Sequence, residues 1–185
     1  MPLIPYADID KLSGDAKERF DRLPVKLNIF KMLANAETCF GPFLGFGTAL
    51  LSRQELDAAL REIVILQVVH IEGGEYEWVQ HVPIGLAVGV SQPQIDAIAA
   101  NRYSADCFTD RDRATMKMAE EVVNNVRARE ETVRSAAKFL SPREMVEVIL
   151  TIGNYMMAAR LTETMRVEID PPAGMKVLDA LKRQS

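Results

Sequence analysis

The feature that most constrains the fold is an apolar run at residues 63–71, which only Gln67 and His70 interrupt. The run is rich in β-branched residues, so its periodicity alone cannot separate a buried strand from a buried helix. The preceding residues 54–62 favour helix and contain no turn residue, so the sequence predicts one continuous helix. Because that helix is apolar on nearly every side, we expect it at the centre of a bundle or buried against another subunit.

Helix start and stop signals recur along the rest of the chain. Ser91, Thr109 and Ser141 are residue types suited to N-cap positions. Ser52 and Glu55 have the spacing of a capping box and are predicted to open the central helix. The predicted helices cover residues 15–22, 27–36, 37–51, 52–72 and 75–87, a short segment after Ser91, residues 110–127, and a segment from 142 onward.

These signals predict an all-α domain of about seven or eight helices. At roughly 150 residues per domain, the 185 residues of the chain are sufficient for one domain. Asp170-Pro171-Pro172 acts as a stop signal, so we expect a single helical domain over residues 1–170. Residues 171–185 are then a C-terminal segment or arm.

Composition excludes several classes of function. A net charge of −4 argues against a nucleic-acid partner or an anionic membrane surface. Cys39 and Cys107 are 68 positions apart and form no CxxC pair, so neither a disulfide framework nor a zinc ribbon is expected. Residues 1–13 lack the pattern of a signal peptide, and the longest apolar run is too short for a membrane span. We therefore expect a soluble, cytoplasmic protein.

Glu62 is the first polar residue that does not fit its surroundings. On a helix its one-turn and two-turn neighbours are apolar, and a carboxylate in such a place is costly unless it is paired. One interpretation is a buried ion pair with Arg61 or Arg160. The other is a functional carboxyl group whose pKa rises through desolvation.

Glu77 and His81 are the second candidate pair. They follow a Gly-Gly turn at 73–74 and are four residues apart, so they share a helix face. A carboxylate beside an imidazole can fix its tautomer and raise its basicity, as a general acid–base histidine requires. The alternative is a solvated surface pair. The only tryptophan, Trp78, lies in the same turn, which favours a site.

A metal centre and a histidine site at position 70 are weaker interpretations. Glu62, Glu77, His81 and His70 could supply ligands, but di-iron bundles need paired Glu-x-x-His elements. Here the spacing is one residue longer and occurs once. We expect no metal and no cofactor. We interpret His70 as a core or interface residue and Tyr155 as a core residue.

With these residues in view, the chain resembles the carboxymuconolactone decarboxylase and alkylhydroperoxidase D-like family. The resemblance spans roughly residues 51–166 and implies an all-helical subunit that assembles as a trimer or hexamer, with sites near the subunit contacts. The motifs that carry it are Leu60-Arg-Glu-Ile-Val-Ile-Leu66, Gly73-Gly74, Glu75-Tyr-Glu-Trp-Val-Gln-His-Val82, Gly89-Val90-Ser91 and, more loosely, Ile152-Gly-Asn-Tyr-Met-Met-Ala-Ala-Arg160.

The redox branch of that family has a Glu, eleven residues, Cys-x-x-Cys, three residues and a His. Counted from Glu62, the cysteine positions fall on Gly74 and Glu77, and the histidine falls on His81. A thiolate is the nucleophile in peroxide reduction, so the resemblance to this branch does not extend to its activity. A peroxiredoxin-like antioxidant protein is therefore a disfavoured alternative.

The decarboxylase branch lacks the cysteines and implies cofactor-free acid–base chemistry on a small lactone or related carboxylated compound. By this resemblance His81 is the proton donor or base, Glu77 orients it, and Glu62 is a second carboxyl group. Tyr76 and Trp78, together with Gly74, are expected at the substrate. The other alternative is a non-catalytic, oligomeric ligand-binding protein in which Glu62 and His81 form a buried structural pair.

Overall fold

The computed structural model describes residues 1–182, which form ten α-helices, one short 3-10 turn (Ile9–Lys11) and no strand. The all-α prediction is confirmed, and the two helices beyond the expected number are α8 and α10. The helices are α1 (Gly14–Arg22), α2 (Asn28–Leu33), α3 (Glu37–Ser52), α4 (Ala58–Glu72), α5 (Glu75–Val88), α6 (Gln92–Ala99), α7 (Asp110–Asn125), α8 (Glu130–Ala136), α9 (Pro142–Met165) and α10 (Gly174–Lys182).

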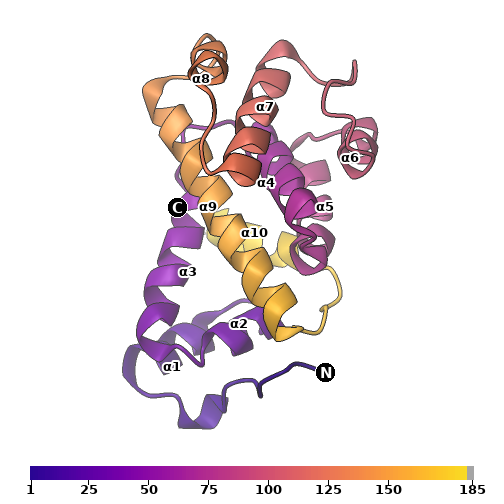
Figure 1. Ribbon diagram of the computed structural model, residues 1–185. Helices are drawn as coiled ribbons and strands as arrows, with labels where there is room; N and C mark the ends of the chain where they lie inside the picture. The colour runs from indigo at the N-terminus through magenta and orange to yellow at the C-terminus, as the bar shows by residue number, and fades with distance from the viewer. Residues whose placement is uncertain (183–185) are drawn as a thin grey trace.

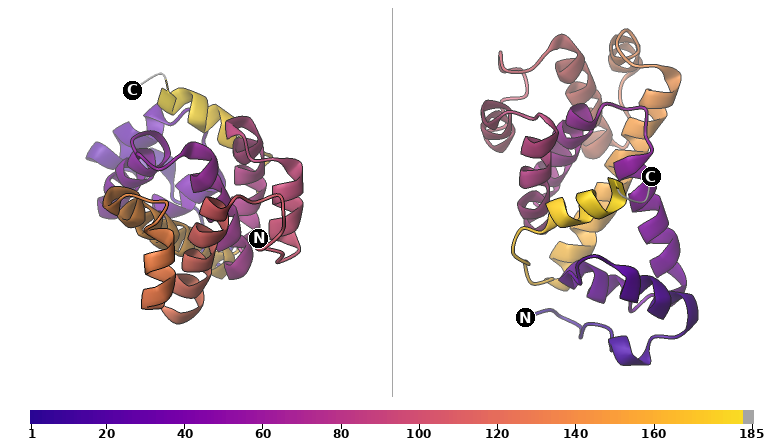
Figure 2. Two further views of the ribbon diagram at one scale, coloured as in Figure 1. Left: turned by 90° about the horizontal axis from the view of Figure 1, so that it is seen from above. Right: turned by 180° about the vertical axis from the view of Figure 1, so that it is seen from behind.

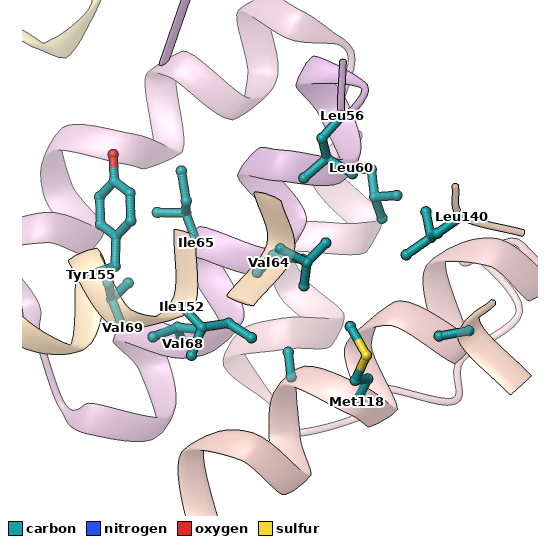
Figure 3. Close-up of a cluster of buried hydrophobic side chains, with 13 residues drawn as sticks. Leu56, Leu60, Val64, Ile65, Val68, Val69, Met118, Leu140, Ile152 and Tyr155 are labelled. Carbon is teal, nitrogen blue, oxygen red and sulfur yellow. The ribbon is translucent and has the colours of Figure 1, made fainter. Parts of the chain in front are cut away.

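The apolar run forms the second half of α4, which packs against α5, α6, α7 and α9. Residues 60–69 are all buried. Figure 3 shows part of this core, where Val64 and Val68 of α4 lie with Ile152 of α9 and Met118 of α7. The central position predicted for this helix is confirmed. Residues 60–69 are buried within one chain, and His70 and Ile71 at the end of the run are partly exposed.

The start of α4 differs from the prediction. Ser52 ends α3 and its hydroxyl donates to the Thr48 carbonyl at 2.8 Å, whereas Asp57 caps α4 by accepting from the Leu60 N–H at 3.0 Å. The Glu147 carboxylate of α9 accepts the N–H groups of residues 55 and 56 at 3.2 and 2.8 Å. This tertiary contact holds residues 53–57 outside both helices and overrides the local capping signal.

Most other helix boundaries follow their local signals, but α2 ends at Leu33 and α7 at Asn125, short of the predicted residues 36 and 127. Ser91, Thr109 and Ser141 each form a capping box at the start of α6, α7 and α9. Gly73 and Gly89 end α4 and α5 with φ values of 73° and 109°, in the left-handed region that glycine adopts without a Cβ penalty.

The helices surround a central group formed by α4, α5 and α9. Figure 1 shows α6, α7 and α8 at one end of the molecule and α1 and α2 at the other, with α3 running between them. The rear view of Figure 2 shows α10 lying across the middle of the molecule. None of the helices in residues 1–182 combines the length and apolarity that crossing a membrane requires.

The C-terminal segment packs on the bundle. The Gln80 side chain of α5 donates to the Asp170 carbonyl at 3.0 Å and accepts from the Ala173 N–H at 2.8 Å. The following helix, α10, contacts α3 and α5. This part of the expected C-terminal segment thus lies against the bundle, and residues 183–185 lie outside the described residues.

Candidate active site

Glu62 and His81 form a buried pair between α4 and α5. His81 Nδ1 lies 2.8 Å from Glu62 Oε2, and the two residues are 8% and 0% exposed. With a carboxylate as its partner, Nδ1 is the donor, which leaves Nε2 as the second ring nitrogen. The pair therefore holds the imidazole in one orientation, as acid–base catalysis requires.

The second Glu62 oxygen, Oε1, lies 3.3 Å from Nε of Arg61, which is also buried. Of the two ion-pair partners considered for Glu62, Arg61 is therefore the one in contact. Arg160 instead pairs with Glu72 at 3.0 Å. Glu62 is thus held by a cation on one oxygen and by the imidazole on the other.

Glu77 lies one turn before His81 but contacts a different helix. The Thr162 hydroxyl of α9 lies 3.0 and 3.1 Å from the two carboxylate oxygens. Glu77 is 3% exposed, and burial raises the pKa of its carboxyl group, against the opposing effect of the Thr162 hydrogen bond. The structure therefore differs from the expected roles: Glu62, on the neighbouring helix, orients the imidazole.

A cavity of about 440 Å³ lies beside the pair. Its walls come from α1, α2 and α3, from α5 and α9, and from α10. Glu77 and His81 both line it, as does Tyr76. The volume is within the range of small-molecule sites, roughly 300–1,000 Å³.

Three of the sequence-predicted residues do not line this cavity. Glu62 reaches it only through His81. Trp78 packs between hydrophobic clusters of the core, with its ring 5.6 Å from that of His70. A Cβ at Gly74 would lie 2.8 Å from the Cβ of Ala159, so this glycine allows α5 to begin close to α9.

Tyr76 lines the cavity while its hydroxyl is used within the fold. That hydroxyl donates to Asp170 Oδ2 at 2.6 Å and accepts from the Ile29 N–H at 3.4 Å. Burial and the Asp170 carboxylate raise the pKa of Tyr76 far above its ordinary value. Tyr76 therefore joins the N-terminal helices to the C-terminal segment at the cavity wall.

Sequence reasoning missed two residues that line the cavity, Asn154 and Tyr155 of α9. The Tyr155 ring meets the His81 ring edge-on, with the centroids 4.8 Å apart and an interplanar angle of 87°. An Asn within the apolar stripe of a predicted helix was the available signal. Tyr155 carried no such signal because a buried tyrosine is common in a core.

Neither cysteine lines this cavity. Cys39 is exposed and borders a separate apolar cavity of about 190 Å³, and the Cys107 thiol lies 3.7 Å from the Pro93 carbonyl oxygen. Within residues 1–182, no group of three or more His, Cys, Asp or Glu side chains could hold a metal ion. The ionisable residues that line the cavity on α5 and α9 are Tyr76, Glu77, His81 and Tyr155.

The model of the carboxymuconolactone decarboxylase family matches residues 40–121, which include α4, α5 and the Glu62–His81 pair. This match confirms the resemblance to the family over these residues. No curated protein matches the chain.

Solved structures share the fold of this chain over most of its length. An uncharacterized peroxidase-related protein from Ralstonia eutropha JMP134, described as an alkylhydroperoxidase AhpD core, is 20% identical with a TM-score of 0.78, covering 96% of this chain and 95% of its own. A putative antioxidant defence protein AhpD from Agrobacterium tumefaciens is 18% identical with a TM-score of 0.68, covering 74% and 94%. A variant of the debrominase Bmp8, in complex with 2,3,4-tribromopyrrole, is 16% identical with a TM-score of 0.71, covering 97% and 95%. At these identities the likeness establishes a common fold.

Proposed function

We propose that this protein catalyses a cofactor-free decarboxylation or proton transfer on a small lactone or related carboxylated compound. The observation that carries the proposal is the 2.8 Å contact between His81 and buried Glu62 at the wall of a cavity of about 440 Å³. The match to the carboxymuconolactone decarboxylase family supports this reaction class. The complex of the similarly folded debrominase with a tribromopyrrole is a precedent for a small cyclic ligand in this fold.

In a decarboxylation the bond to the carboxyl group breaks, carbon dioxide leaves, and the electron pair remains on the substrate as an enolate. Protonated His81 then delivers a proton from Nε2 to carbon, while Glu62 stabilises the charged imidazole through Nδ1. The raised pKa of Glu77 favours a neutral carboxyl group at higher pH than usual, so Glu77 can donate a hydrogen bond to the substrate. Glu62 is a positioning residue, whereas His81 and Glu77 line the cavity.

The test compares variants on a panel of five-membered lactones that carry carboxyl groups. We expect His81→Ala to lower kcat/KM by at least about 100-fold, and Glu62→Gln to lower kcat and shift its pH profile. His70→Ala is the matched control, because His70 is the only other histidine and packs on Trp78 outside the cavity. Full activity in a folded His81→Ala variant would contradict the proposal.

A thiol peroxidase is the competing function, since two solved structures of this fold are described as peroxidase-related and antioxidant proteins. The discriminating variant replaces both Cys39 and Cys107 with serine. We expect this variant to keep full activity on the lactone panel. Peroxide consumption with a dithiol reductant that disappears in the double variant would instead establish thiol chemistry.

Ligand binding without turnover is the third outcome. In that case the wild-type chain binds a panel compound but forms no product, and Glu62 and His81 are a structural pair. Removing one partner of a buried pair leaves the other unpaired, so both variants would then lose stability by roughly 3–5 kcal/mol without any change in catalysis. Thermal melts of the same variants measure this directly.

We also propose that the subunit forms a homo-oligomer, a trimer or a hexamer. The match to the family supports this assembly. Several apolar side chains exposed on one side of α9 would supply a contact surface.

A further inference from the structure

Two neighbouring residues of α9 present polar groups to the cavity without a hydrogen-bond partner. Asn154 is 6% exposed, and its Oδ1 atom accepts no hydrogen bond from any described residue. Tyr155 is also 6% exposed. Burial and nearby charges set the pKa of its hydroxyl, and no hydrogen bond contributes. Both residues line the cavity. A buried amide is normally paired, so Asn154 points to a partner from outside the chain, and Tyr155 is its neighbour on the same cavity wall.

The neighbouring polar side chains of the same wall are paired within the fold. Glu77 is hydrogen-bonded to Thr162, and the Gln80 carboxamide is held by the backbone at Asp170 and Ala173. The missing partners at Asn154 and Tyr155 therefore do not reflect a cavity wall in which every polar side chain is unpaired.

That place lies beside the imidazole. The edge-on contact between the Tyr155 and His81 rings brings the phenol and the imidazole together, and Nδ1 of the imidazole is already bonded to Glu62. Figure 3 shows the Tyr155 hydroxyl directed away from the apolar side chains of Val69 and Ile152. The polar end of the cavity therefore offers a phenol, an amide and the remaining imidazole nitrogen.

The rest of the lining is mostly apolar. Charged residues at the α1 side of the cavity pair with one another, Arg19 with Asp15 at 2.6 Å and Arg22 with Glu18. These pairs leave no unpaired cation for a highly charged ligand among the described lining residues. The apolar lining includes Leu27, Ile29, Phe43, Leu44, Ile84 and Val177.

We propose that Tyr155 and Asn154 bind the oxygen of a carbonyl or single carboxylate group on a compact, otherwise apolar ring. This inference rests on the proposed function, because it places that oxygen next to His81. The Tyr155 hydroxyl donates one hydrogen bond, and the Asn154 amide, whose nitrogen and oxygen can exchange places by rotation, donates the other. The pair selects ligands with one planar oxygen-bearing group and rejects polyanions.

The electrostatics of the phenol suit this role. Burial, and next the nearby Glu62 carboxylate, raise the pKa of Tyr155 well above its ordinary value of 10. The hydroxyl therefore keeps its proton at neutral pH and remains a hydrogen-bond donor, as stabilisation of a developing oxyanion requires.

The test uses benzoate, methyl benzoate and toluene as probes of one ring size, with binding measured by NMR titration. We expect the wild-type chain to bind both oxygen-bearing probes at least tenfold more tightly than toluene. Tyr155→Phe and Asn154→Leu should each weaken the oxygen-bearing probes about tenfold and leave toluene unchanged. Benzoate and methyl benzoate separate a carboxylate preference from a carbonyl preference.

Stability provides a readout that needs no ligand. Asn154→Leu removes a buried polar group without a partner, so we expect an unchanged or higher Tm together with weaker binding. Gln67→Leu is the control, because Gln67 is fully buried with an unpaired Oε1 atom but does not line the cavity. This control should leave the binding of all three probes unchanged.

Three results would overturn the inference: no preference of the wild-type chain for the oxygen-bearing probes, an unchanged preference in both variants, or an equal loss for toluene. Its failure is distinguishable from failure of the proposed function. If the wild-type chain shows no turnover but Tyr155→Phe loses the preference for oxygen-bearing probes, the ligand site is supported and the enzyme is contradicted. If His81→Ala loses turnover but Tyr155→Phe keeps the preference, the enzyme is supported and the ligand site is contradicted.

Discussion

Glu77 is a buried carboxyl group whose hydrogen-bond partner is the neutral Thr162 hydroxyl. Burial raises its pKa above the ordinary 4.5, so the folded chain binds this proton more tightly than the unfolded chain. The free energy of unfolding should therefore fall as pH rises from about 4.5 through the raised value. We expect Glu77→Gln to remove this fall, as measured by urea unfolding between pH 4 and 8, because glutamine does not titrate.

Glu75→Gln is the matched control for this prediction, because Glu75 lies in the same first turn of α5 and is exposed. It should leave the pH dependence of the wild-type chain in place. Parallel stability curves for the wild-type chain and Glu77→Gln would contradict the prediction.

At the scale of residues, the sequence singled out the candidate residues of the proposed site but not their contacts. Glu62, Glu77 and His81 stood out because polar residues interrupt an apolar pattern. The four-residue spacing suggested that Glu77 orients His81, but spacing within one helix carries no information about a carboxylate on the next helix. For the same reason, Tyr155 looked like an ordinary core residue.

At the scale of elements, local capping chemistry predicted most helix boundaries. It failed at the start of α4, where Glu147 of α9 binds the N–H groups of residues 55 and 56 and the helix begins at Ala58. The capping box predicted at Ser52 does not form, because the buried Glu147 carboxylate satisfies two backbone donors at once. Long-range partners of this kind cannot be read from a local pattern.

The observed cap gives a direct test. Asp57→Ala removes the acceptor of the Leu60 N–H, so we expect a loss of about 1 kcal/mol in the free energy of unfolding. Ser52→Ala should change it by less than about 0.5 kcal/mol, because the Ser52 hydroxyl bonds only within α3. Denaturant unfolding of the two variants side by side measures the difference. Equal losses would mean that Ser52 also contributes to the start of α4.

At the scale of the whole molecule, the two ends of the chain complete the cavity. Helices α1–α3 form one wall, and α10 forms another. They are joined where Asp170 Oδ2 accepts both the Asn28 N–H and the Tyr76 hydroxyl, each at 2.6 Å. The sequence predicted α1–α3 but not α10. It could not place the two walls around one site, because contacts such as the one between Asn28 and Asp170 join residues 142 positions apart.

We expect the proposed homo-oligomer to form at the outer side of α9. The exposed apolar residues of this helix are Val146, Ile149, Leu150 and Met157. Its exposed apolar side chains recur at helical spacing and leave an apolar stripe uncovered in a single chain, which is typical of a subunit contact. Replacing both Ile149 and Leu150 with glutamate should dissociate the oligomer, because charges are costly in a buried contact. Leu86→Glu is the matched control, as Leu86 is similarly exposed but lies on α5. Sedimentation velocity measures the mass of each form; a monomeric wild-type chain would contradict the oligomer, and an intact double variant would place the contact elsewhere.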